Sequence, residues 1–444
     1  TMTRYRDDFP CPVAFAEQAV EGTLAEVLAE QGSAQLHAAE TEKYAHVTYF
    51  FNCGVETPYP GEDRILVPSQ KVATYDLMPE MSAPGITDQL VADLDARRHR
   101  IIICNFANAD MVGHTGNLDA AIAAVETLDR CLARIVTTVE RAGGSMIITA
   151  DHGNLEEMIG MDGSPHVAHT ANLVKFILID PRSTTTEKLR DGKLADVAPT
   201  VLSVLGLAQP EDMAGKTLTV DHDWGGKRRV LLLILDGWGI GRHDSSNAIF
   251  LAQTPVWDEL LRHHSGSRLE AAGEAVGLQP GKTGNSEAGH MNLGAGRVVL
   301  QDDVRLDLAM QDGSFYTNEI LCRALVDVKS RGAGLHLIGL LSEKSSHGSV
   351  DYPLALLRMA KEHGLKDVYL HMILDGRSTE PGSAPVLFEK LQGEMEEIGV
   401  GQVVSVVGRG IALDRDGNYA KTRRAYEAFV YGKGAHFVMD REGQ

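Results

Sequence analysis

Residues 101–149 read IIICNFANADMVGHTGNLDAAIAAVETLDRCLARIVTTVERAGGSMIIT, and this stretch decides the expected fold. It begins with the apolar run Ile101–Cys104 and ends with the apolar run Met146–Thr149. Between them, apolar residues recur at helical spacing, with Asn117 placed to cap the helix and Gly143-Gly144 placed to end it. Two apolar strands joined by a helix form a βαβ unit, which predicts parallel strands.

Similar apolar runs occur along the rest of the chain. Continuous apolar strands that alternate with helices are typical of a parallel sheet covered on both faces. At 444 residues the chain is long enough for two or three such domains, so we expect an α/β protein. The stretch that most resembles a linker is Asp221–Arg229, which is polar and contains glycine. The other apolar runs are Val174–Ile179, Val230–Leu235, Leu335–Leu341, Val368–Leu374 and Val403–Val407.

Composition excludes several classes of partner. Lys and Arg number 42 against 61 Asp and Glu, and the net charge of −19 opposes binding to nucleic acid or anionic lipid. No apolar run approaches the 18–20 residues that cross a bilayer. The first eight residues lack the apolar segment of a secretory signal, and the five cysteines form no CxxC pair. We therefore expect a cytoplasmic protein with a small-molecule substrate.

Aspartate and histidine follow the apolar runs repeatedly. In open α/β sheets, ligands gather at the C-terminal ends of strands, so these side chains are candidate metal ligands. Carboxylate and imidazole without thiolate favour Mn²⁺, Zn²⁺ or Mg²⁺, and the candidates suffice for two ions that could assist an in-line phosphoryl displacement. They are Asp236 after the run 230–235, Asp110 and His114 after 101–104, Asp151 and His152 after 146–149, and the later pair His166 and His169.

A nucleophile is expected in the glycine-rich stretch Gly281–His290. Ser286 lies in this stretch, and flanking glycines allow a metal ion to approach closely. A free serine hydroxyl is a poor nucleophile, but metal coordination lowers its pKa. Ser286 is therefore the candidate nucleophile.

Six motifs together resemble the cofactor-independent phosphoglycerate mutases of the alkaline phosphatase superfamily. The resemblance implies an alkaline-phosphatase-like sheet domain that binds two Mn²⁺ ions and a serine that becomes phosphorylated, with a second α/β domain that holds phosphoglycerate. It implies an enzyme, a metal-dependent phosphotransferase or phosphomutase. We expect the protein to be a monomer. The motifs are residues 40–44, 110–116, 150–154, 166–170, 235–239 and 284–290.

The resemblance also assigns roles to individual residues. Lys43 is similar to a family lysine that contacts the phosphoryl group, a role that suits a compact charge. One metal ion would be held by Asp110, His114 and His169, and the other by Asp236, Ser286, Asp151 and His152.

The motifs stand in a permuted order. The family begins near residues 230–239, whereas here that segment follows the one that resembles the family's C-terminus. We therefore expect a metal-binding phosphatase-like domain over residues 18–300, joined near 221–229. A transferase-like domain, residues 301–444 plus 1–17, lacks a family segment with two substrate-binding arginines.

The substrate motifs differ from the family pattern more than the metal motifs do. In Ser342–Ser349 only the first serine and His347 are kept, and in Asp375–Ser378 a serine replaces an aspartate after Arg377. Gly408–Asp416 keeps Arg409 and Arg415 but loses two tyrosines. His347, Arg377, Ser378, Arg409 and Arg415 are the candidate substrate-binding residues.

These departures leave several hypotheses open. The leading one is Mn²⁺-dependent transfer of a phosphoryl-type group through Ser286 on a phosphoglycerate-like substrate, with an altered pocket. One alternative moves a phosphonate group from an activated, nucleotide-linked donor onto phosphoglycerate, and Ser378 and the small Gly410 favour it. A phosphatase or phosphodiesterase of the same superfamily is another. A non-catalytic binding protein is disfavoured by the intact metal set.

Overall fold

The computed structural model of this protein describes residues 1–6, 8–182, 188–220, 224, 228–343, 348–377, 379–380 and 382–435. The chain divides into two compact units, each with its own hydrophobic core. The large unit is Gln18–Gln301, and the small unit combines Thr1–Glu17 with Asp302–Gln444. Most of the expected linker 221–229 lies outside the described residues, but Trp224 is buried in the core of the large unit.

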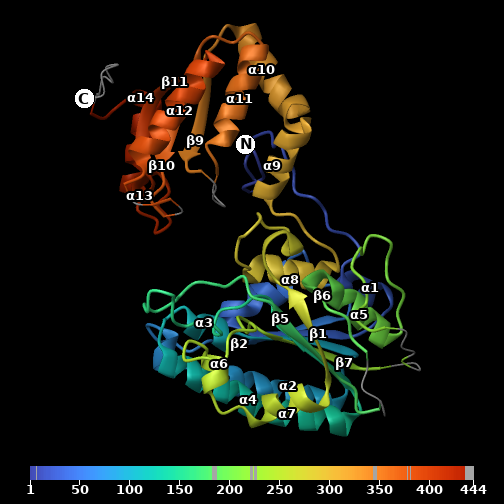
Figure 1. Cartoon of the computed structure of the whole chain (residues 1–444). Helices are drawn as coiled ribbons and strands as arrows, with labels where there is room; N and C mark the ends of the chain where they lie inside the picture. Colours follow the sequence, from blue (N-terminus) through green and yellow to red (C-terminus); the bar gives the residue numbers. More distant parts are fainter. Residues whose placement is uncertain are drawn as a thin grey trace. The chain divides into compact units, whose positions relative to one another are not determined.

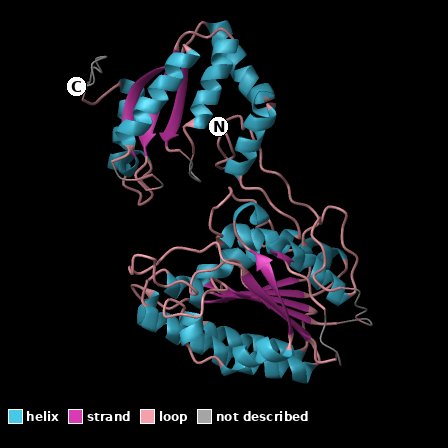
Figure 2. Ribbon diagram, viewed as in Figure 1, coloured by secondary structure: helices cyan, strands magenta, loops and turns pink. Residues whose placement is uncertain are grey.

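The large unit is built on a mixed sheet with the strand order β2-β1-β3-β7-β4-β5-β8-β6 (Figure 2). The strands from β2 to β4 in this order run parallel. The α/β fold class expected from the sequence is therefore confirmed. The strands are β1 Gln35–Glu40, β2 Glu62–Val67, β3 Ile101–Phe106, β4 Ser145–Thr149, β5 Val174–Ile179, β6 Gly192–Lys193, β7 Val230–Leu235 and β8 Ser265–Glu270.

Strand β5 runs antiparallel to β4 and β8, so the sheet is not parallel throughout. The connection from β4 to β5, residues 150–173, is fully described and contains no helix. Without a helical crossover the chain re-enters the sheet from the edge where β4 ends, and it must run backwards. This loop therefore stays at the C-terminal edge of the parallel strands, where it contributes His152 and His169.

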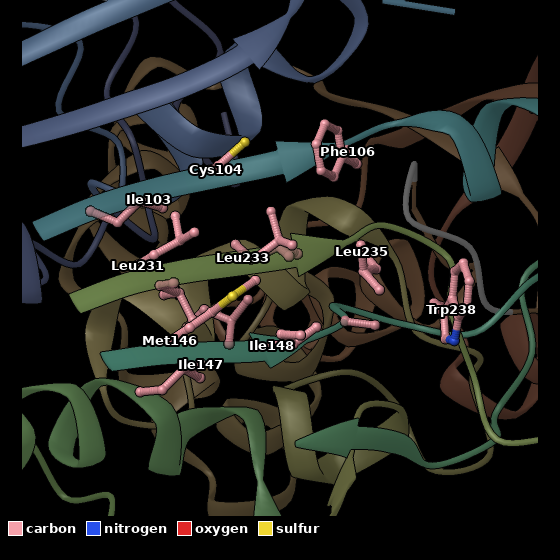
Figure 3. Close-up of a cluster of buried hydrophobic side chains, with 14 of the residues drawn as sticks. Ile103, Cys104, Phe106, Met146, Ile147, Ile148, Leu231, Leu233, Leu235 and Trp238 are labelled. Carbon is pink, nitrogen blue, oxygen red and sulfur yellow. The ribbon is translucent and has the colours of Figure 1, made fainter. Parts of the chain in front are cut away.

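Strand β7 occupies the middle of the large sheet, between β3 and β4. Every residue of β7 is buried. Figure 3 shows Leu231 and Leu233 of β7 among Ile103 of β3 and Met146 and Ile148 of β4. Burial of each leucine side chain contributes roughly 1.5–3 kcal/mol, so β7 is a major part of the core.

Helices cover both faces of the large sheet, with α2, α4 and α7 on one face and α1, α5 and α8 on the other (Figure 1). At the start of α4 the Asn117 side chain accepts a hydrogen bond from the Ala120 N–H, and at its end Gly143 has a left-handed φ of 66°. Among the described residues, no helix combines the length and the apolar character needed to cross a membrane. The helices are α1 Leu24–Glu30, α2 Ala83–Ala96, α3 Asn108–Gly113, α4 Leu118–Ala142, α5 Val197–Leu205, α6 Ala248–Leu251, α7 Pro255–His263 and α8 Ser286–Ala295, with short 3-10 helices η1 Thr41–Lys43, η3 Tyr75–Leu77, η4 Leu194–Asp196 and η5 Gly273–Val276 and a π-helix η2 His46–Phe50.

The small unit contains a parallel sheet with the strand order β11-β10-β9. Because the strands are parallel, their C-terminal ends share one edge, where Asp375 and Arg409 follow β10 and β11. The elements are β9 Leu335–Leu341, β10 Val368–Leu374, β11 Gln402–Gly408, α9 Asp302–Asp312, η6 Ser314–Thr317, α10 Glu319–Arg331, α11 Asp351–Glu362, α12 Ala384–Ile398, α13 Arg409–Ala412 and α14 Tyr419–Tyr431.

Candidate metal centre

The C-terminal ends of β3, β7 and β4 place three aspartates at one edge of the large sheet. Asp236 directly follows β7, Asp151 comes just after β4, and Asp110 lies in α3 after β3. All three residues are buried, at 0%, 0% and 3% exposure respectively. Three buried carboxylates so close together repel one another unless cations lie between them, so the centre requires positive charge.

Lys43, in η1, supplies part of that charge. Its Nζ donates hydrogen bonds of 2.7 Å to Asp110 Oδ2, to Asp236 Oδ1 and to Ser286 Oγ. Burial alone would lower the pKa of Lys43, but the neighbouring carboxylates, Asp110 first, raise this pKa above its ordinary value. All three ammonium hydrogens are engaged, so Lys43 is a fixed cation.

Ser286 begins helix α8 and lies at the centre of these contacts. The Asn285 side chain caps the helix by accepting a hydrogen bond from the Ala288 N–H, which fixes the position of Ser286. Ser286 Oγ is 2.9 Å from His152 Nε2 and donates a 3.1 Å hydrogen bond to Asp236 Oδ1. The start of a helix also favours negative charge, which suits a developing alkoxide.

His114 and His169 converge on Asp110. Both Nε2 atoms lie 3.1 Å from Asp110 Oδ1, and they are 3.0 Å from each other. The Nδ1 atoms lie 2.7 Å from the Val167 carbonyl oxygen and 2.9 Å from the Gly284 carbonyl oxygen. Since Nδ1 must donate to these carbonyls, the lone pair of each neutral ring is on Nε2 and faces the centre.

The protonation pattern shows how strongly these groups interact. Burial opposes charging of His152, but the Asp151 and Asp236 carboxylates raise its pKa to about 10. Burial would raise the pKa values of Asp110 and Asp236, but Lys43 holds both well below their usual range. Protons on Lys43 and His152 therefore offset part of the negative charge of the three aspartates when no other cation is bound.

The residues of the centre fit divalent metal ions. Ligand atoms of Asp110, His152 and His169 lie within 4.8 Å of one another, as do those of Asp151, Asp236 and His290. Asp151 Oδ2 is buried and has no hydrogen-bond partner. Carboxylate and imidazole ligands are those preferred by Mn²⁺, Zn²⁺ and Mg²⁺.

His290 and Asn105 were missed in the sequence analysis. His290 Nδ1 lies 2.9 Å from the Ser286 carbonyl oxygen and 3.2 Å from Asp151 Oδ2. Asn105 Nδ2 donates to Asp236 Oδ2 at 2.7 Å and lies 3.0 Å from His290 Nε2. Both nitrogens of His290 therefore have partners, and its ring is anchored to the Ser286 carbonyl oxygen in the first turn of α8. Its place one helical turn after Ser286 was the available signal.

The large unit brings together Lys43 and every metal-site candidate carried over by resemblance. His166 is absent from both groups of clustered ligand atoms among the described residues, and its Nδ1 lies 2.8 Å from the Glu157 carbonyl oxygen. It is therefore a natural control residue.

The candidate substrate residues belong to the small unit. Arg409 donates a 2.6 Å hydrogen bond to Asp375, whose side chain is fully buried. Arg377 and Arg415 are exposed. His347 and Ser378 lie outside the described residues.

Comparison with known proteins identifies two family matches. The description "Metalloenzyme superfamily" matches residues 14–209, and "BPG-independent PGAM N-terminus" matches residues 306–442. The description that is named for the N-terminus of its family thus matches the later of the two segments in this chain.

Individual relatives match about half of the chain. The 2,3-bisphosphoglycerate-independent phosphoglycerate mutase of Moorella thermoacetica is 56% identical over 219 residues, which cover 49% of this chain and 42% of the relative. The protein of that name from Acaryochloris marina is 52% identical over 225 residues, which cover 49% of this chain and 42% of the relative. A crystal structure of Leishmania mexicana phosphoglycerate mutase at low cobalt concentration is 29% identical, covers 44% of this chain and 39% of its own, and has a TM-score of 0.41. The chain spans less than half the length of the curated relatives it matches.

Proposed function

The chain belongs to the cofactor-independent phosphoglycerate mutase family, and on that premise we propose that it transfers a phosphoryl-type group through Ser286 on a phosphoglycerate-like substrate. The observation that carries the proposal is the position of Ser286 Oγ, within hydrogen-bond distance of Lys43, His152 and Asp236. A hydroxyl held in this way is oriented for attack on phosphorus. Transfer in two steps through the serine would account for a mutase-like reaction.

The proposal includes two divalent cations, Mn²⁺ foremost, with Zn²⁺ and Mg²⁺ as the alternatives that these ligand types admit. When bound, such ions lower the pKa of a coordinated hydroxyl and neutralise charge on the phosphoryl group. The residues that would hold them are Asp110, His114 and His169 for one ion, and Asp236, Ser286, Asp151 and His152 for the other.

Replacing His114 by alanine is expected to remove about one bound ion per chain, because a site with three protein ligands binds weakly once it loses one. The measurement is the Mn²⁺ content of the purified protein after gel filtration. His166→Ala is the matched control and should keep the wild-type content. Unchanged content in the His114 variant would remove His114 from the site.

Lys43 has a direct role in this reaction. One of its three N–H donors points at Ser286 Oγ. It therefore stabilises negative charge that develops on this oxygen, and it can contact the incoming phosphoryl group. Its links to Asp110 and Asp236 keep the ammonium in place for each transfer.

The small unit is proposed to bind the substrate, with residues 18–300 as the metal-binding domain and 301–444 plus 1–17 as the transferase-like domain. Arginines suit this role because their forked N–H groups match phosphate and carboxylate oxygens. Asp375 supports it by holding the Arg409 side chain in place. The proposed substrate-binding residues are His347, Arg377, Ser378, Arg409 and Arg415.

We also propose that the chain order is permuted relative to the family. The description named for an N-terminus matches residues 306–442, after the match at 14–209. Strand β7, which follows the proposed join, lies in the sheet between β3 and β4, which precede the join. Both observations support a fusion near residues 221–229.

Ordinary phosphoglycerate mutase activity is expected to be weak, because the substrate pocket is altered. Ser378 offers one short hydroxyl where the family pattern has a carboxylate, and a site that loses a hydrogen-bonding group to substrate can lose roughly 10⁴–10⁵ in discrimination. The measurement is turnover of 3-phosphoglycerate with Mn²⁺, coupled to enolase. A kcat of about 10 s⁻¹ or more, an ordinary enzyme rate, would contradict the altered pocket. Ser378→Asp alone should not restore activity, since Gly410 and Ile411 differ as well.

The same assay separates the alternatives. Ser378 and the residues Gly410 and Ile411, which are smaller than those of the family pattern, favour transfer of a phosphonate from an activated, nucleotide-linked donor. Such donors should be tested beside 3-phosphoglycerate. Release of inorganic phosphate without a phosphorylated second product would instead identify a phosphatase.

A further inference from the structure

Glu156 is a buried carboxylate, 1% exposed, in the loop between β4 and β5. Its Oε2 accepts hydrogen bonds from the Asn154 N–H at 2.8 Å and the Gly239 N–H at 3.0 Å. Its Oε1 accepts from the Asn172 amide at 3.0 Å and from the Thr170 hydroxyl. Four neutral donors thus satisfy the carboxylate, and these donors offset the cost of burying its charge.

The donors come from three segments that carry proposed metal ligands. Asn154 follows Asp151 and His152 in the chain, and Gly239 follows Asp236. Thr170 directly follows His169. One side chain therefore joins the segments that supply ligands to both proposed ions.

Two glycines allow this close approach. A Cβ atom at Gly153 would overlap Glu156 and Thr170, and a Cβ atom at Gly239 would overlap the Glu156 carboxylate. The backbones of both loops thus lie directly against Glu156. A side chain at either glycine would force Glu156 away from these backbones.

Asn154 extends the connection to the remaining aspartate. Its Nδ2 donates a 3.1 Å hydrogen bond to Asp110 Oδ1, the oxygen that faces His114 and His169. Because Glu156 fixes the Asn154 backbone, it also influences the orientation of Asp110.

We propose that Glu156 is a positioning residue that sets the spacing of the metal-binding loops, an inference that rests on the proposed metal-dependent function. It acts through hydrogen bonds to the loops and makes no contact with metal or substrate. Groups that hold metal ligands in place typically contribute a factor of about 10–100 to metal affinity.

The test measures Mn²⁺ affinity directly, by calorimetry on the metal-free full chain, beside the free energy of unfolding in chelator. Glu156→Ala is expected to weaken binding by about 10–100-fold. Glu156→Gln should give a smaller loss than alanine, because its amide oxygen can still accept from the Asn154 and Gly239 N–H groups while its NH2 group cannot accept from Asn172. Thr170→Val, which removes one donor, should give a smaller loss in the same direction and serves if the alanine variant does not fold.

The matched control is Glu157→Ala, the neighbouring residue, which should bind Mn²⁺ as the wild type does. Wild-type affinity in Glu156→Ala would overturn the inference, even if that variant is less stable. Equal losses in Glu156→Ala and Glu156→Gln would also overturn it, because the hydrogen bonds from the Asn154 and Gly239 N–H groups, which glutamine keeps, would then contribute nothing to the affinity. If the wild-type chain binds Mn²⁺ but turns over no phosphorylated substrate, the proposed function is wrong, and the affinity comparison still decides the role of Glu156. If the wild-type chain binds no Mn²⁺, both the proposed function and the role of Glu156 are wrong.

Discussion

Replacing Ser286 by alanine is expected to lower kcat by roughly 10⁴-fold or more without unfolding the chain, because it removes the proposed nucleophile. The variant keeps helix α8, since the Asn285 cap remains. The measurement is the turnover rate of whichever substrate the wild type converts. Transfer of label from a phosphorylated substrate to the protein should also disappear.

Ser267→Ala is the matched control for this variant. Ser267 lies in β8 of the same unit, is buried, and its hydroxyl has no hydrogen-bond partner. The turnover rate of the Ser267→Ala variant should equal that of the wild type. A Ser286 variant that retains more than a few per cent of the rate would indicate direct transfer to water or to an acceptor, which favours the hydrolase alternative.

Replacing Lys43 by methionine is expected to destabilise the metal-free protein by about 3–5 kcal/mol, the typical cost of leaving a buried charge without its partner. The ammonium bonds to Asp110 and Asp236, and all three side chains are 4% exposed or less. With Mn²⁺ present the loss should be much smaller, because the metal ions then balance the carboxylates. The measurement is the free energy of unfolding in urea, with chelator and with Mn²⁺.

Lys71→Met is the control, since Lys71 is exposed and a surface charge of this kind contributes little to stability. Its effect should be small under both conditions. If Lys43→Met loses the same free energy in chelator and in Mn²⁺, the lysine and the metal ions do not balance the same aspartates. The electrostatic account of the centre would then be wrong.

Much of the fold could be predicted from apolar runs. Val174–Ile179 and Val230–Leu235 coincide with β5 and β7. Strand β1, Gln35–Glu40, was missed because it carries polar residues although it is fully buried. His37 is accommodated by a 2.6 Å contact from Nδ1 to the Val47 carbonyl oxygen, and Gln35 donates to the Ala25 carbonyl oxygen. Such partners are set by tertiary structure and leave no local pattern in the sequence.

Some residues of the candidate site could likewise be predicted from the sequence, and others could not. The aspartates could be located because they follow strands that share an edge, a rule that depends only on topology. Asn105 and Glu156 could not be located from the sequence, because their roles depend on hydrogen bonds to segments that are distant in the chain. Asn105 lies within an apolar strand, where a single amide is readily taken for a tolerated polar residue. The antiparallel β5 was also beyond prediction, since an apolar run carries no information on strand direction.

The central place of β7 affects how the protein is made. On the ribosome, β3 and β4 emerge well before β7, although β7 separates them in the finished sheet. At roughly 5–20 residues per second, synthesis leaves their inner edges unpaired for several seconds. Unpaired apolar edges are templates for aggregation, and premature pairing of β3 with β4 would exclude β7. The nascent chain is thus expected to depend on chaperones during this interval, a cost of synthesising the central strand after its neighbours.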